Sequence, residues 1–390
     1  MKRRLEIVGA GIAGLTAAAA FALRGWDVTV HERSDSLRAV GSGIYIWENG
    51  LKILNAIGAY DQAVAGSHWG LIRETRNAQN AVTAVHRFAQ IGDGRVVAVV
   101  RQQLMDALAA AATKAGARIE FGSQAVGADE RGAVQFADGS SREADMVIAA
   151  DGVGSRIRDA LGLLRDRRVL GDGAIRVMIP RLESERNTTG ERNNAWNGIG
   201  GSNVSEGFKF IEYWSGKRRV LYTPCNDEWV YLALTSPNED EAHKVPIDRA
   251  LWTASFPHLA QLFERMGSEG HWGRFEVVRL KRWTKGRVVI LGDAAYAQAP
   301  NLGQGGGCAM MGALSLAHFV TKEASLDDAF ARWEASERPL YEQTQSFSSF
   351  ISASTYWPDV VRSAFFSIAS RSEWFTAKRW RAARHTPVGL

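Results

Sequence analysis

The sequence predicts an α/β protein in which a parallel sheet with covering helices is joined to an inserted β-sheet region and followed by C-terminal helices. Three observations support this prediction: a β-α-β unit at the N-terminus, two later strands that each end in a short polar motif, and an alternating aromatic stretch between those strands. The 390 residues are 46% hydrophobic and 23% charged, which is ordinary for globular proteins. Composition therefore disfavours a disordered chain and a multi-span membrane protein.

The N-terminal unit begins with an apolar strand at residues 5–8 and a turn at residues 9–14. An alanine-rich helix follows over residues 15–23, Gly25 ends it, and residues 27–31 alternate as a second strand. Three basic residues at positions 2–4 before this apolar run imitate a signal peptide, but Glu6 and the glycines interrupt the run. We therefore expect no export signal and a cytoplasmic protein.

The turn of this unit carries a nucleotide-binding pattern. Gly9, Gly11 and Gly14 form G-x-G-x-x-G, and Glu32 ends the second strand, 23 residues after Gly9. The glycines suit a tight turn, close approach to a pyrophosphate and close helix packing, while Glu32 suits a ribose hydroxyl. This predicts a Rossmann-like dinucleotide site, but the pattern does not separate FAD from NAD.

Three further segments carry polar motifs at strand ends. A strand end and helix start meet at Arg101, which could reach a phosphate with its guanidinium. A buried strand ends at Asp151-Gly152, and another ends at Gly292-Asp293. Pro300 and a glycine cluster, with Gly303, Gly305, Gly306 and Gly307, then open a helix whose N–H groups could face an anionic ring or phosphate.

Together these motifs resemble the class A flavoprotein aromatic hydroxylases of the para-hydroxybenzoate hydroxylase fold, from Leu5 to about Pro339. The resemblance implies an FAD site whose ADP end is held at Gly9, Gly11, Ala13, Gly14, Glu32 and Arg33, with Arg101 and Asp151 at the phosphates. It assigns Gly292 and Asp293 to the ribitol, and Pro300 with the residues from Gly303 to Gly307 to the isoalloxazine. Tyr296 departs from the histidine of many members, and we expect FAD binding to survive this change.

The implied reaction consumes NADH or NADPH and O₂ and transfers oxygen to an electron-rich aromatic acid through a flavin C4a-hydroperoxide. Three runs, at residues 37–50, 220–226 and 303–310, resemble the branch of the family that oxidises hydroxypyridine carboxylates, in some cases with ring opening. The alternatives are a hydroxybenzoate or salicylate hydroxylase and a non-oxygenating flavin dehydrogenase.

The resemblance also assigns substrate contacts. Arg219 would face the substrate carboxylate and Tyr231 the ring substituents, with Tyr222 and Tyr45 as weaker candidates. Arg73 stands where the pyridine-oxidising branch has a tyrosine, so either the substrate differs or Arg73 faces solvent. No histidine occupies a recognisable position for a base, so we expect no dedicated catalytic base, and His68 is the strongest exception.

These assignments place an FAD-binding domain at residues 1–170 and 275–335, a substrate-binding sheet at 70–100 and 171–274, and a helical region at 336–390. The net charge of +5 comes mostly from the two chain ends, so we expect no nucleic-acid partner, and we also expect no membrane partner. The two cysteines, Cys225 and Cys308, cannot form a Cys-only metal site, and no metal is predicted. The aromatic-rich C-terminal helices indicate packing on the main body or on a partner subunit, which makes a homodimer a candidate assembly.

Overall fold

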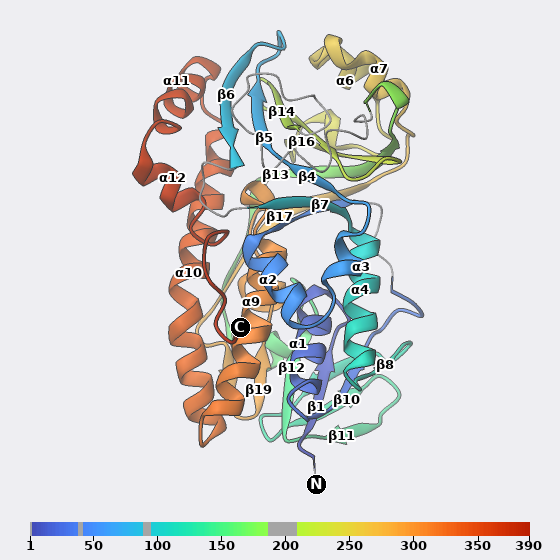
Figure 1. Ribbon diagram of the computed structural model, residues 1–390, viewed down its shortest axis with the longest axis vertical. Coiled ribbons are helices and arrows are strands. Elements are labelled where there is room, and N and C mark those ends of the chain that lie inside the picture. The colour runs from blue at the N-terminus through green and yellow to red at the C-terminus, as the bar shows by residue number, and fades with distance from the viewer. Residues whose placement is uncertain (1, 38–41, 89–94, 186–208) are drawn as a thin grey trace.

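The computed structural model describes residues 2–37, 42–88, 95–185 and 209–390 (Figure 1). Its nucleotide-binding part is built on a six-stranded sheet of order β18-β19-β12-β1-β2-β8. All neighbouring strands are parallel except the edge pair β18-β19. The strands are β1 (Arg4–Val8), β2 (Asp27–His31), β8 (Arg118–Glu120), β12 (Met146–Ala149), β18 (Thr284–Lys285) and β19 (Val288–Ile290). The predicted α/β class and N-terminal β-α-β unit are confirmed.

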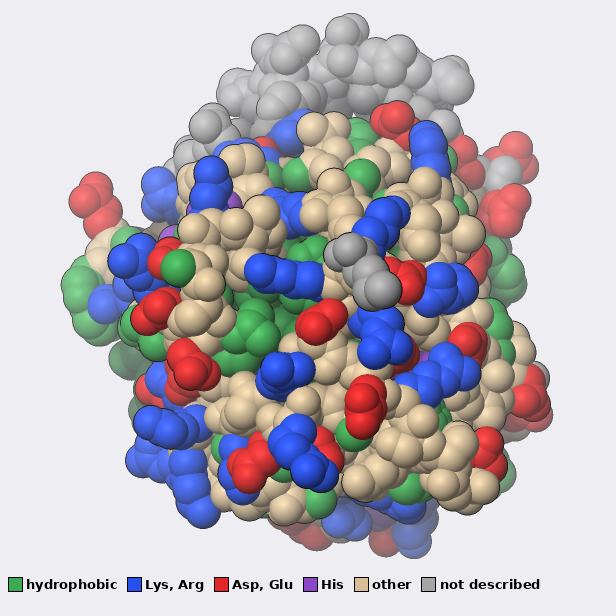
Figure 2. Space-filling model, turned by 90° about the horizontal axis from the view of Figure 1, so that it is seen from below, with side chains coloured by type: hydrophobic (Ala, Val, Ile, Leu, Met, Phe, Trp, Pro, Cys, Tyr) green, Lys and Arg blue, Asp and Glu red, His purple; other side chains and the backbone are tan. Residues whose placement is uncertain are grey.

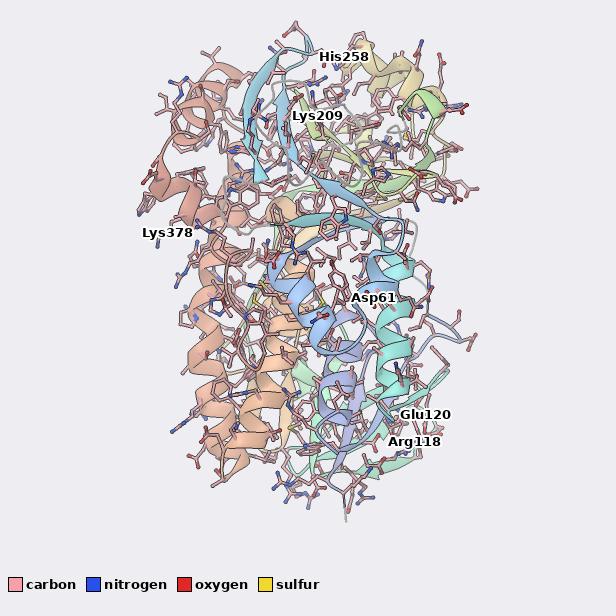
Figure 3. All side chains as sticks on the ribbon, viewed as in Figure 1. Asp61, Arg118, Glu120, Lys209, His258 and Lys378 are labelled. Atoms are coloured by element: carbon pink, nitrogen blue, oxygen red, sulfur yellow. The ribbon has the colours of Figure 1, made fainter. Side chains whose placement is uncertain are left out.

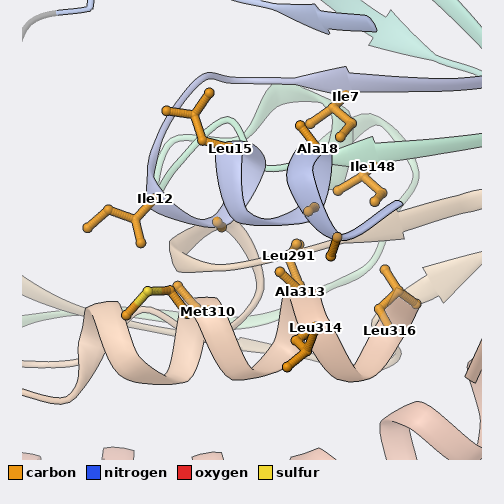
Figure 4. Close-up of a cluster of buried hydrophobic side chains, with 14 of the residues drawn as sticks. Ile7, Ile12, Leu15, Ala18, Ile148, Leu291, Met310, Ala313, Leu314 and Leu316 are labelled. Carbon is orange, nitrogen blue, oxygen red and sulfur yellow. The ribbon is translucent and has the colours of Figure 1, made fainter. Parts of the chain in front are cut away.

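Helix α1 (Ile12–Ala22) is buried on every side because it lies between this sheet and helix α9 (Gly305–Lys322). Small residues allow the close approach: α1 is half alanine, and α9 begins with three glycines. Figure 4 shows Ile12 and Met310 where the two helices meet, and Ile7 and Ile148 on the neighbouring strands. Burying each such aliphatic side chain contributes about 1.5–3 kcal/mol, so this contact fixes the two helix N-termini beside each other.

The second large sheet has seven strands in the order β17-β13-β16-β15-β14-β5-β6. Its strands are β5 (Ile72–Arg76), β6 (Val82–Arg87), β13 (Leu164–Pro180), β14 (Lys209–Ser215), β15 (Arg218–Pro224), β16 (Trp229–Pro237) and β17 (His271–Leu280). Alternate side chains form two separate cores, one on each face. One core packs against the short helices α6 (Arg249–Ser255) and α7 (Ala260–Glu264), and the other faces the nucleotide-binding part.

Two smaller sheets complete the β structure. One has the order β3-β7-β4, with β3 (Gly43–Trp47), β4 (His68–Gly70) and β7 (Val96–Val100), and the other has the order β11-β10-β9, with β9 (Ala125–Ala128), β10 (Ala133–Phe136) and β11 (Ser141–Glu143). Helices α2 (Glu48–Ala56), α3 (Tyr60–Val64) and α4 (Arg101–Lys114) flank the first of these. The predicted sheet segment 70–100 is therefore divided: residues 72–87 join the seven-stranded sheet, whereas 96–100 pair with β3 and β4. The sequence run at 37–50 lies partly outside the described residues.

The C-terminus is helical, as predicted. Helix α10 (Leu326–Ser354) begins at Ser325, whose hydroxyl accepts the Asp328 N–H at 3.1 Å, and it runs beside α9 (Figure 1). Helices α11 (Asp359–Ala369) and α12 (Glu373–Arg379) turn back against the β5-β6 edge of the large sheet. Within the described chain no helix is long and apolar enough to cross a membrane. On the face shown in Figure 2, basic and acidic side chains are interspersed.

Candidate active site

The first glycine loop lies at the carboxyl end of β1. Gly9 has a left-handed φ of +100°, and its N–H donates to the His31 carbonyl at 2.8 Å. A Cβ added to Gly14 would lie only 1.9 Å from the Gly9 carbonyl oxygen, so α1 packs on the loop only because Gly14 has no side chain. A Cβ on Gly11 would meet no protein atom within 4 Å. The loop is thus tight at Gly9 and Gly14 and open at Gly11, which is the arrangement a pyrophosphate needs.

Glu32 follows β2 at the same edge of the sheet. Its two carboxylate oxygens accept the N–H groups of Ala10 and Ser34, each at 3.0 Å, and this fixes the side chain beside the glycine loop. Each oxygen keeps a lone pair for a further donor such as a hydroxyl. Its neighbour Arg33 is exposed.

The Asp151 loop follows β12 and touches the first glycine loop: a Cβ on Gly9 would lie 2.5 Å from the Ala150 carbonyl oxygen. Burial raises the pKa of Asp151, and its Oδ1 atom has no hydrogen-bond partner among the described residues. The fully buried Arg158 donates to the carbonyls of Val153 at 2.9 Å and Ala294 at 3.1 Å. Arg158, which the sequence reasoning missed, therefore ties this loop to the segment after β19.

The segment after β19 completes the cluster. Gly292 has a φ of +67°, and a Cβ there would lie 2.7 Å from the Cβ of Ala13. Asp293 is exposed, and its partial desolvation by the protein raises its pKa against the opposing effect of Arg101 and Arg176. Asp293 is thus near enough to Arg101 for the two charges to interact. The backbone N–H of Arg101 donates to the Ser42 carbonyl at the start of α4, and its side chain is exposed. Arg176, on β13, was not predicted.

The second glycine cluster lies at the N-terminus of α9, next to α1. A Cβ on Gly306 would lie 3.7 Å from Ile12. The preceding turn holds the exposed Pro300, and the Gly303 carbonyl accepts the indole N–H of Trp47 at 3.1 Å. The buried Nε2 atom of Gln304 has no hydrogen-bond partner among the described residues. The N-terminal turn of α9, with Gly305, Gly306 and Gly307, therefore presents backbone N–H groups beside the first loop.

The large sheet turns one face toward these loops, and we call it the inner face. The strand registers place alternate residues of six strands on it, including Ala174 and Arg176, Tyr231 and Ala233, Arg219 and Leu221, Phe210 and Glu212, and Arg73 with His86. Tyr45 meets this face from β3, with its hydroxyl bonded to Thr223 and its ring 4.8 Å from Phe210. Burial raises the pKa values of Tyr45 and Tyr231, so both remain neutral phenols.

Arg219 is on the inner face, but its charge is already paired. Its guanidinium, in a residue only 4% exposed, lies 3.1 Å from Asp172 and 3.4 Å from Glu212. It also donates to Asn301 Oδ1 at 3.0 Å and lies 4.8 Å above the Trp214 ring. Of its nitrogens, Nε has no partner among the described residues. Arg219 is therefore not a free cation for a substrate carboxylate, because its guanidinium already pairs with two protein carboxylates.

Arg73 does not face bulk solvent. It donates to Glu212 at 2.6 Å and lies in the wall of a cavity under α11 and α12. Burial works to raise the pKa of Glu212, but Arg73, Arg219 and Arg379 outweigh it and the pKa is lowered. Glu212 and Asp172, the carboxylates that pair with these arginines, were not predicted from the sequence. Glu212 is two residues from Phe210 on the same strand, so both side chains lie on the same face of the sheet.

Tyr222 was assigned to the wrong face. It is three residues from Arg219 on the same strand, so its side chain points to the opposite side of the sheet. There it belongs to the core against α6 and α7, and burial raises its pKa. The prediction that Tyr222 contacts substrate is therefore contradicted by the strand geometry.

The side chains of His68 and Tyr296 lie away from the glycine loops. The buried His68 interacts through Nε2 with Asp227 at 3.2 Å and with Arg181 at 2.8 Å. Tyr296 is buried against Trp283 and Tyr341 beneath α9, which explains why its difference from histidine leaves the loop after β19 intact. In the described part of the chain, no group of three or more His, Cys, Asp or Glu side chains is arranged to hold a metal ion.

Comparison with known proteins agrees with this geometry. Residues 4–326 match the family model described as an FAD binding domain. The chain is 43% identical over 386 residues to the "Putative 2-heptyl-3-hydroxy-4(1H)-quinolone synthase AqdB1" of Rhodococcus erythropolis, covering 99% of this chain and 97% of that protein. It is 40% identical over 370 residues to the 2-heptyl-3-hydroxy-4(1H)-quinolone synthase of Mycobacteroides abscessus, covering 94% of both chains.

Among solved structures, a variant of 2-methyl-3-hydroxypyridine-5-carboxylic acid oxygenase superimposes with a TM-score of 0.85 at 36% identity, covering 100% of this chain and 98% of that one. A tetrameric form of the same oxygenase gives a TM-score of 0.84 at 36% identity, with 99% and 97% coverage.

Proposed function

Because the chain belongs to the family of FAD-dependent aromatic-ring monooxygenases, we propose that it inserts one oxygen atom of O₂ into a 4-quinolone ring, with NADH or NADPH as the reductant. The observation that carries this choice of substrate is the pairing of Arg219 and Arg73 on the inner face, while Arg176 on the same face bonds to Tyr231. Arg219 and Arg73 already face protein carboxylates, so the site suits a neutral ring better than an aromatic acid. The names of the two quinolone synthases that resemble the chain point to the same ring.

The loops at the sheet edge fit an extended FAD. The ADP end would lie at the Gly9–Gly14 loop and Glu32, the ribitol beside Asp293 and the ring beside Pro300 and the N-terminus of α9. The Asp151 Oδ1 and Gln304 Nε2 atoms, which have no partner in the part of the chain that the structure describes, and the open surface at Gly11 support this fit. When bound, FAD supplies the reduced flavin chemistry that activates O₂.

The inner face would bind and orient the ring. Tyr231, which remains protonated, is a hydrogen-bond donor suited to a ring carbonyl, and Arg176 next to it fixes its orientation. Phe210, Tyr45 and Trp47 supply the aromatic walls that exclude water. A 4-quinolone is electron-rich at C3 through its ring nitrogen, so oxygen transfer there needs no base to ionise a phenol, in keeping with the paired state of His68.

The test is substrate-dependent oxygenation by the purified FAD-loaded protein. We expect 2-heptyl-4(1H)-quinolone to stimulate NADH or NADPH oxidation and to gain one ¹⁸O atom from ¹⁸O₂, as measured by mass spectrometry. Stimulated oxidation without label in the product would instead support a dehydrogenase. Failure of the purified protein to bind FAD would refute the proposed function.

A hydroxypyridine carboxylate is the second candidate substrate. The 36% identical oxygenase, which covers the whole chain, favours it. Parallel assays with 2-methyl-3-hydroxypyridine-5-carboxylate and with hydroxybenzoates distinguish the two, since only the preferred ring should couple reductant consumption to labelled product.

We propose a homo-oligomer as the assembly. Helices α11 and α12 expose Val361, Ile368 and Trp374, and the related pyridine oxygenase has a tetrameric form. Light scattering of the wild type and of Ile368→Lys tests this surface: a larger mass for the wild type that falls in the variant supports it, and a monomeric wild type refutes it.

A further inference from the structure

A cavity of about 350 Å³ lies between the β5-β6 edge of the large sheet and helices α11 and α12. We call it the outer cavity. Its lining includes the apolar side chains of Ile351, Phe366 and Phe375 and the nitrogen-bearing side chains of Arg73, His86 and Arg379. A volume of this order suits a small organic molecule.

The outer cavity contains a buried cation, Arg379, that forms no ion pair with the carboxylates the structure describes. Arg379 is 8% exposed, its Nε atom has no hydrogen-bond partner, and no ion pair joins it to any carboxylate among the described residues. Its guanidinium lies 5.1 Å from the centre of the Trp380 ring, and Glu212, which pairs with Arg73, opposes the effect of burial on its pKa. The other arginines of the lining are paired: Arg73 with Glu212, Arg76 with Glu74, and Arg362 with Asp359.

The neighbouring groups show that this region is electropositive. Glu212 is shared by Arg73 and Arg219, and Asp172 is the remaining buried carboxylate, so three guanidinium groups face two carboxylates. Burial, with Arg379 and Arg73, lowers the pKa of His86 to about 3, so the imidazole is neutral at physiological pH. Burial lowers the pKa of Arg379 itself to about 9. An uncompensated buried cation is costly, and an anionic ligand would remove that cost.

The outer cavity shares Arg73, His86 and Glu212 with the β5-β6 end of the inner face, away from the flavin-side turn. Arg73 and Glu212 line the cavity, and Arg219, which pairs with Glu212, donates to Asn301 on that turn. Neither Pro300 nor Tyr231 lines it. We propose that the outer cavity binds an amphiphilic monoanion, a carboxylate on an apolar body, with its charge on Arg379 and its apolar part among Ile351, Phe366 and Phe375. This site goes beyond the proposed oxygenation and holds a different ligand from the ring that is oxidised.

The experiment compares octanoate with octanamide, which has a similar shape and no charge, by calorimetric titration of the FAD-loaded protein. Charged hydrogen bonds exceed neutral ones by enough that we expect octanoate to bind about ten-fold or more tightly. Arg379→Gln should abolish this preference, and Arg379→Lys should keep part of it. The matched control is Arg381→Gln, because Arg381 is exposed two residues away; Lys378, the residue before Arg379, lies on the outer side of α12 (Figure 3). Equal binding of the two probes, or an unchanged preference in Arg379→Gln, overturns the proposal.

Thermal melting gives a readout that a merely structural arginine would not produce. Without octanoate, Arg379→Gln should melt no lower than the wild type, because the substitution removes an unpaired buried charge. With octanoate, the wild type and Arg381→Gln should gain stability and Arg379→Gln should not. A gain in Arg379→Gln equal to that of the wild type contradicts the proposal.

Competition separates this site from the proposed function. We expect saturating octanoate to leave binding of 2-heptyl-4(1H)-quinolone and NADH unchanged. Displacement of octanoate by either compound would assign the outer cavity to the substrate or to the dinucleotide and would refute a separate anion site, whatever the outcome of the oxygenation assay.

Discussion

Replacing Arg219 with methionine tests whether this arginine organises the protein or binds a substrate anion. In the structure its guanidinium pairs with Asp172, whose side chain is 1% exposed, and with Glu212. Arg219→Met leaves Asp172 with the Ser352 hydroxyl as its remaining side-chain partner, while Glu212 keeps Arg73. Removing one partner of a buried pair costs about 3–5 kcal/mol, so we expect that loss in the free energy of unfolding.

Arg218→Met is the matched control. Arg218 is the preceding residue, its side chain points to the opposite face, and its pair with Asp240 at 2.7 Å is partly exposed. A pair of that kind contributes about 1 kcal/mol or less. Urea unfolding of both variants, followed by tryptophan fluorescence, measures the difference, and adding Asp172→Asn to Arg219→Met should restore part of the loss because the stranded charge is removed.

The reasoning fails if Arg219→Met costs no more stability than Arg218→Met. It fails most clearly if, at unchanged stability, Arg219→Met raises the KM of an aromatic acid about a hundred-fold, since that is the behaviour of a free carboxylate anchor.

The remaining predictions concern the cofactor loop, the sheet faces and acid stability. Gly14→Ala forces a side chain onto the Gly9 carbonyl and should lower thermal stability together with FAD affinity, whereas Gly11→Ala should leave the stability of the FAD-free protein unchanged and weaken FAD binding about ten-fold, as measured by flavin fluorescence. Tyr222→Phe should leave kcat/KM for the ring substrate within about two-fold of the wild type, and a ten-fold loss would return Tyr222 to the site. The pKa of Glu212 is lowered in the folded state. The ionised Glu212 therefore stabilises the protein above its unfolded-state pKa, and this stabilisation is lost as the pH falls through its folded-state pKa. Between about pH 5 and pH 3, Glu212→Gln should lose less stability than the wild type in urea titrations.

The cofactor loops were predictable from the sequence because they are made by backbone. Gly9, Gly14 and Gly292 are glycines for reasons visible in a few residues of chain: a left-handed φ or a carbonyl in the place of a Cβ. Parallel strands bring their carboxyl ends to one edge, so the distant motifs met as expected. The helix start at Ser325 is likewise a local signal.

The substrate side was less predictable because it depends on partners from other strands. The surroundings of Arg219 come from Asp172, Glu212 and Asn301, which are 47, 7 and 82 residues away in the chain. No local sequence pattern predicts that two carboxylates will form ion pairs with one arginine. Tyr222, by contrast, could have been placed correctly, since a spacing of three along a strand already puts it on the face opposite Arg219.

The alternation of the large sheet has a practical consequence for engineering. Under the proposed function, the loops that would hold the cofactor lie outside this sheet, so the positions that would select the ring are alternate ones such as Phe210, Leu221, Tyr231 and Ala233. A mutant library confined to those positions leaves the α6-α7 core and the sheet registers intact. Substrate range can therefore be explored by mutating every second residue of a few strands, with little effect on the stability of the protein.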